Sequence, residues 1–168
     1  EGGGGGTRRQ LLSRILTGIT LSLAGLGLLL VLFAPGLERL AYLSFASLFE
    51  EGVIYLTNQV AKTIDEEDYD KLADISQANG RLADKLLQPM VFWSEGNSGD
   101  PDQQWAQSLL ALTERADKGV LALQEAAVEE DADKAVMAYG AIKEAVQEYV
   151  RQVNTHVKND LPPLSEVK

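Results

Sequence analysis

The sequence predicts an all-α protein, an up-down four-helix bundle preceded by a single N-terminal transmembrane helix. Residues 15–37 form one apolar run that contains no charged side chain. From there to residue 163, apolar residues recur every three or four positions, which is the period of a helix with one buried face. No stretch shows the strict alternation of apolar and polar residues that indicates a strand.

The apolar run at 15–37 is long enough to cross a bilayer, because a transmembrane helix needs about 20 apolar residues for a hydrocarbon core of roughly 30 Å. Arg8, Arg9 and Arg14 precede it, and Glu38 is the first charged residue after it. Basic flanks stay on the cytoplasmic or stromal side, so we expect the domain after residue 37 to be translocated. The stretch TRRQLL at 7–12 also resembles a twin-arginine export signal.

A cleaved signal peptide is the alternative interpretation of this segment. Ser44-Phe45-Ala46 has the small-x-small pattern of a cleavage site, but it lies far downstream of the apolar run. We therefore interpret 15–37 as a retained anchor behind a flexible basic stub at 1–14. We expect 38–48 to be an interfacial connector, because its aromatic residues suit the headgroup level; the same residues could instead form the first turns of the next helix.

Four stripes of inward-facing residues predict a four-helix bundle over residues 49–163, followed by a C-terminal tail at 164–168. Short acidic links at 65–68 and 129–131 suit the positive ends of helices, and we expect Asp65 to cap the second helix. Short links favour antiparallel neighbours. The stripes are Phe49, Val53, Leu56, Val60 and Ile64; Tyr69, Leu72, Ile75, Leu82 and Leu86; Trp105, Leu109, Leu112, Ala116, Val120 and Leu123; and Ala135, Tyr139, Ile142, Val146, Tyr149, Val153 and Val157.

The second helix is predicted over residues 67–88, with Asn79 interrupting its apolar face and Pro89 ending it. Residues 89–101 then form the one long connection. Asp100 and Pro101 mark the start of the third helix, as a capping residue followed by a proline at the first helical position. The fourth helix ends before Leu161-Pro162-Pro163.

Composition narrows the class of partner. The formal net charge is -10, and because the first 14 residues contain three arginines and one glutamate, the remainder carries -12. An acidic domain of this kind does not suit binding to nucleic acid or to an anionic membrane surface. The chain has no cysteine, which excludes disulfides, thiolate metal sites and lipidation on cysteine.

The residues predict no catalytic group and no metal site. The one histidine, His156, is expected to face solvent, the alternative being an axial ligand to a pigment or haem. The acidic clusters at 66–70 and 129–133 lie at helix starts, so we interpret them as caps rather than cation ligands, since they lack the spacing of a calcium loop. No cofactor is predicted, and binding of chlorophyll or lipid is left open.

The predicted partner-binding residues are Met90, Phe92 and Trp93, at the head of the long connection. A contiguous exposed apolar group usually marks an interaction site, and Trp is enriched among interface hot spots. The alternative is that these residues form a lid over the end of the bundle's own core. Trp105, Tyr139 and Tyr149 are expected to be core residues.

The second half of the chain resembles PsbQ, an extrinsic subunit of photosystem II. The resemblance lies in a leucine- and acid-rich helix, an acidic link, DKAVMAY at 133–139, a tyrosine ten residues on and LPP at 161–163. The stretches TIDEEDYDKLADI at 63–75 and LLQPM at 86–90 are similar to the first helix pair of that family. It covers roughly residues 60–163 and is a pattern of helix lengths and spacings without a diagnostic motif.

The resemblance implies a non-catalytic, structural subunit whose bundle lies in the thylakoid lumen and stabilises or covers photosystem II. Its partners would be photosystem core or antenna subunits, and its amino terminus would be stromal. The chain departs from the family in having neither an obvious cleavage site at the expected place nor a lipidated cysteine, which implies a membrane-anchored relative. Two alternatives stay open: a subunit of photosystem I or of another thylakoid complex, and a membrane-anchored periplasmic sensor domain.

Overall fold

The computed structural model describes residues 38–97, 103–157 and 160–168. These residues are helical apart from turns and a C-terminal segment, and no strand occurs among them, so the predicted all-α class is confirmed for this part of the chain. The predicted stub at 1–14 and membrane span at 15–37 lie outside the described residues. Among the helices that are described, none is long and apolar enough to cross a bilayer.

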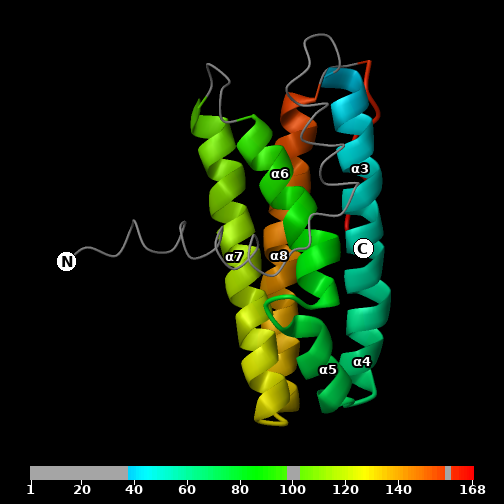
Figure 1. The fold of residues 1–168 in the computed structure, drawn as a ribbon, viewed down its shortest axis with the longest axis vertical. Helices are drawn as coiled ribbons and strands as arrows, with labels where there is room; N and C mark the ends of the chain where they lie inside the picture. Colours follow the sequence, from blue (N-terminus) through cyan, green and yellow to red (C-terminus); the bar gives the residue numbers. More distant parts are fainter. Residues whose placement is uncertain (1–37, 98–102, 158–159) are drawn as a thin grey trace, which may run out of the picture.

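The described helices lie side by side as four rods that run alternately in opposite directions (Figure 1). The first rod is continuous from α3 through a π-helical turn, η1, to α4; the second runs from α5 through a second π-helical turn, η2, to α6. The third and fourth rods are α7 and α8. Their bounds are α3 Glu38–Tyr55, η1 Leu56–Val60, α4 Ala61–Asp65, α5 Tyr69–Ser76, η2 Ala83–Leu87, α6 Gln88–Gly96, α7 Gln103–Val128 and α8 Ala132–His156.

One continuous apolar core runs between the rods. Each predicted stripe supplies fully buried residues to it, among them Leu56, Leu82, Leu109 and Ile142. Tyr69, Trp105, Tyr139 and Val157 are only half-buried. The long helices α7 and α8 have the most extensive contact, because their apolar faces are the longest and most regular in the chain.

Both acidic links form the same turn, built from the repeated pattern ED-x-DK at 67–71 and 130–134. Glu67 and Glu130 adopt left-handed backbone conformations, with φ of 51° and 54°. The next residue in each turn, Asp68 or Asp131, accepts a hydrogen bond from the backbone N–H three positions on. The helix before each turn therefore ends in a left-handed residue and the helix after it begins with an aspartate cap; Asp68, not the predicted Asp65, caps the second rod.

The expected interfacial connector at 38–48 is instead the beginning of α3. Tyr42 and Phe45 are fully buried in the core, where both rings contact Trp93 of α6. The stretch is helical because its aromatic residues belong to the same buried face that continues through Phe49. The bundle therefore begins at least as early as Glu38.

The second rod departs from the prediction of one helix over 67–88. Helix α5 ends at Ser76, and Gln77 adopts an extended conformation with ψ of 166°. The backbone N–H of Gly80 donates to Gln77 O in a turn, and Asn79 is exposed there rather than on the inward face. Asn and Gly favour turns over helix interiors, so the apolar stripe continues across a break.

Pro89 does not end the helix, and the predicted connection at 89–101 is largely helical as α6. A proline lacks the N–H that would bond the carbonyl four residues earlier, which here is Lys85 O. The preceding turn is π-helical: the N–H of Gln88 donates to Ala83 O, five residues back. The Lys85 carbonyl faces α3 at Gly52, where a Cβ would lie 2.1 Å from its oxygen. The wider turn and the missing side chain together accommodate the proline within the rod.

We predict that Gly52→Ala destabilises the bundle by about 1–3 kcal/mol, because the new methyl group forces α3 away from the Lys85 carbonyl. Gly140→Ala is the matched control, since a Cβ at Gly140 meets nothing within 4 Å and alanine favours helix over glycine by about 1 kcal/mol. Chemical denaturation of the two variants measures both effects. Equal stability of the two variants would contradict the close approach at Gly52.

Candidate functional site

The three predicted partner-binding residues lie on α6, and two of them face inward. Met90 is 0% exposed and Trp93 is 8% exposed, while Phe92 is half-buried. The expectation that all three form an exposed docking group is therefore wrong for Met90 and Trp93. Their burial favours the alternative that they close the core at this end of the bundle, and the reason is that 88–96 is a helix with an inward face rather than a loop.

Trp93 is part of an aromatic cluster that joins α3, α6 and α8. Its indole stacks on the ring of Phe45, with centroids 4.8 Å apart and an interplanar angle of 10°, and meets the edge of Tyr42 at 5.6 Å. Phe49 stacks on Tyr149 of α8 at 5.5 Å. These side chains come from helices far apart in the sequence, so no local pattern could have grouped them.

Tyr149 places the only polar atom of its ring deep in this cluster, where the side chain is 0% exposed. Its hydroxyl donates to Met90 O at 2.9 Å and lies 3.1 Å from Ser94 Oγ, while Ser94 Oγ also donates to Met90 O at 2.6 Å. Burial raises the pKa of Tyr149, because the phenolate would have no water to solvate it. The hydroxyl is thus a fixed neutral donor that ties α8 to α6.

The predicted C-terminal tail at 164–168 is packed against the bundle, with Leu164 and Val167 both buried. Asn154 of α8 forms two hydrogen bonds with Leu164: its Nδ2 donates to Leu164 O at 3.0 Å, and its Oδ1 accepts from the Leu164 N–H at 2.7 Å. On the α3 side, Ser165 donates to Glu50 Oε1 and Tyr42 donates to Pro162 O at 2.6 Å. Residues 160–168, here called the C-terminal segment, therefore bridge α3 and α8.

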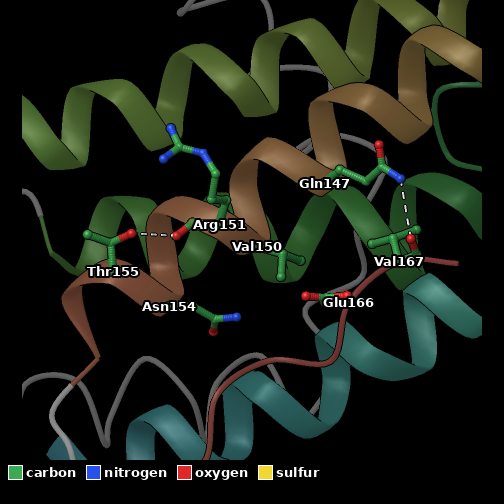
Figure 2. A pocket seen from close by; sticks show the side chains of 7 residues that line it. All are labelled: Gln147, Val150, Arg151, Asn154, Thr155, Glu166 and Val167. Atoms are coloured by element: carbon green, nitrogen blue, oxygen red, sulfur yellow. Dashed lines mark hydrogen bonds between the residues drawn. The ribbon is translucent and has the colours of Figure 1, made fainter.

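A groove of about 530 Å³ lies where the C-terminal segment crosses α8 (Figure 2). Its lining is mostly polar and includes Asn154, Thr155 and Glu166. Gln147 donates across it to Val167 O at 3.3 Å. The guanidinium of Arg151 is already engaged by Glu148, with a 2.8 Å Nε–Oε2 contact, which lowers the pKa of Glu148 to about 2. These lining groups hold the C-terminal segment in place.

His156 is exposed, as predicted, and its ring stacks on Trp105 with centroids 4.5 Å apart. Its Nδ1 lies 3.0 Å from Gln152 O, one turn back on α8. Trp105 packs at the edge of the core, so the expectation that it is a core residue is only partly met. Tyr139 is likewise half-buried, whereas Tyr149 is fully buried.

The acidic residues of the two turns serve as caps, and no group of three or more His, Cys, Asp or Glu side chains in the described ranges is arranged to hold a metal ion. What the sequence did not indicate is the set of large apolar side chains left in solvent. On α3 these are Leu40, Leu43 and Ile54; around the α7–α8 turn they are Val128, Val136 and Met137. They escaped notice because several fall in stretches otherwise assigned to helix faces or links.

The comparisons with known proteins bring no relative: neither a family model, nor a curated protein, nor a solved structure matches this chain.

We predict that Trp93→Ala lowers the free energy of unfolding of the bundle by about 3–5 kcal/mol, because it removes a buried ring at the centre of the aromatic cluster. Trp93→Phe should retain most of the stability. It keeps a ring against Phe45 and removes an indole N–H that has no hydrogen-bond partner among the described residues. Denaturant titration measures both variants. A Trp93→Ala bundle as stable as the parent would restore the docking interpretation.

We also predict that Leu164→Ala costs about 2–5 kcal/mol, the usual range for a truncated buried leucine, because the C-terminal segment fills part of the core. Ser165→Ala is the neighbouring control. Its partner Glu50 is at the surface, so the loss should stay near 1 kcal/mol or below. If thermal unfolding gives the same midpoint for Leu164→Ala as for the parent, the C-terminal segment adds nothing to the fold.

Proposed function

We propose that this chain is a non-catalytic structural subunit of a thylakoid photosynthetic complex. In this proposal a PsbQ-like, up-down four-helix bundle lies in the lumen, carried by a transmembrane helix at 15–37, and stabilises or covers photosystem II. Its partners are photosystem core or antenna subunits, and its amino terminus is stromal. Photosystem I, or another thylakoid complex, is the alternative host.

The observation that supports the proposal most is the agreement between the helical segments and the stretch that resembles PsbQ. The motif DKAVMAY at 133–139 lies in the first turns of α8, directly after an acidic turn, and LPP at 161–163 follows the end of that helix. The stretch at 63–75 likewise spans the end of α4, an acidic turn and α5. The arrangement of elements is therefore the one that the resemblance requires.

The packing of the described residues also suits a structural role. The aromatic cluster and the C-terminal segment close the bundle with side chains of the chain itself, so the interior is committed to stability. A membrane-anchored sensor domain, the second alternative, would need a site for its signal; the grooves on α8 are shallow, polar and occupied in part by the chain's own hydrogen bonds.

The test is purification of the native complex in mild detergent with an antibody against the bundle, followed by identification of the co-purifying chains. We expect chlorophyll-binding subunits of photosystem II in stoichiometric amount. Subunits of photosystem I in their place would move the proposal to the alternative host. A complex without any chlorophyll-binding protein would overturn it, and an unrelated antibody on the same membranes is the control for contamination.

A further inference from the structure

Three glycines lie within the helices of the bundle, and two of them are explained by close packing inside the chain. A Cβ at Gly52 would lie 2.1 Å from the carbonyl oxygen of Lys85, and one at Gly119 would lie 2.6 Å from Cγ1 of Ile142. At Gly140 of α8, a Cβ would meet nothing within 4 Å. Glycine costs about 1 kcal/mol relative to alanine in a helix, and at Gly140 no contact among the described residues requires it.

The surface around Gly140 is apolar. Val136 is 59% exposed and Met137 is 75% exposed, and Ala141 is also exposed. Met137, Gly140 and Ala141 follow at intervals of three and four residues, so they share the outer face of α8, opposite the buried Ile142. This group, the outer α8 patch, combines side chains that bury well against a partner with a position where a backbone can approach closely.

Carboxylates flank the outer α8 patch at both ends. Asp133 precedes it and Glu144 follows it, about 16 Å apart along the helix at 1.5 Å per residue, and both are exposed. Within the described part of the chain neither forms an ion pair; the nearby Lys134 bonds Glu129 and Asp131, and Arg151 bonds Glu148. The patch therefore presents an apolar centre between two negative charges.

This charge pattern selects the occupant. A second copy of the chain would bring Asp133 and Glu144 against the same two carboxylates, in either relative direction of the helices, and each copy carries a formal charge of -10. Such juxtaposition of like charges is unfavourable. A helix with an apolar middle and a Lys or Arg at each end would instead bury the patch and pair both carboxylates.

We propose that the outer α8 patch is the docking surface for a helix of a partner protein, with small or apolar residues at its centre and basic residues about 16 Å apart at its ends. Gly140 lets the partner's backbone approach α8 closely, in the way Gly119 lets α8 approach α7. The surface is independent of Met90, Phe92 and Trp93, and it does not depend on which complex hosts the chain.

The experiment places the photo-crosslinking amino acid p-benzoyl-phenylalanine at position 137 of the full chain, in its native membranes. We expect a crosslink to one helical segment of another protein, flanked by Lys or Arg. The matched control carries the same amino acid at Ala111, an exposed position of α7, and should give little product. Gly140→Leu in the position-137 variant should lower the yield about tenfold or more, as expected for a loss of 1.4 kcal/mol or more in binding, while the melting temperature confirms that the bundle remains folded.

Three results would overturn the proposal: crosslinks to lipid or to a second copy, equal yields from positions 137 and 111, or a yield unaffected by Gly140→Leu. The outcome is separable from that of the proposed function. A basic-ended helix in a protein of a non-photosynthetic complex would uphold the docking surface and count against the thylakoid role. Co-purification with photosystem II without a crosslink from position 137 would do the reverse.

Discussion

The packing of Tyr149 against the aromatic rings of α3 is the constraint on which the rest of the bundle depends. Its ring fills the space between α8 and α3, with centroids 5.5 Å from Phe49 and 6.4 Å from Phe45, and its hydroxyl must be satisfied because it is fully buried. Met90 O and Ser94 Oγ satisfy it, which requires that 88–96 be a helix aimed at this point. Rings of this size keep α3 and α8 apart, and the C-terminal segment occupies the space that results.

The sequence predicted the parts of the fold that depend on local periodicity. Helices α7 and α8 begin and end close to the predicted positions, because their apolar stripes are long and their caps are strong. It failed where tertiary packing overrides local signals. Pro89 and Asn79 mark a helix end and a helix interior by their intrinsic preferences, yet the first lies inside a rod and the second in a turn. The deciding partner of Pro89, Gly52, lies on another rod.

The same failure explains the misread site. Met90, Phe92 and Trp93 were expected to be exposed because a loop was expected, and a loop cannot bury them in a regular way. Once 88–96 is helical, its inward face carries Met90 and Trp93 and its hydrogen-bonding face carries Ser94. The surface that the chain does leave apolar, around Met137, was assigned to a stripe-bearing helix whose outer face drew no attention. Recognising it required the exposure of each side chain and the space around Gly140.

The contacts of the C-terminal segment bear on the order in which the bundle can fold. Tyr42 and Pro162 are 120 residues apart, and Glu50 and Ser165 are 115 apart. Contacts of such long sequence separation close the largest loops and form late. During synthesis, α3 therefore emerges long before the residues that cover one of its faces, so that face stays wet and open to chaperones or export factors until residues 160–168 arrive. Completion of the core is in this sense coupled to completion of translation through Val167.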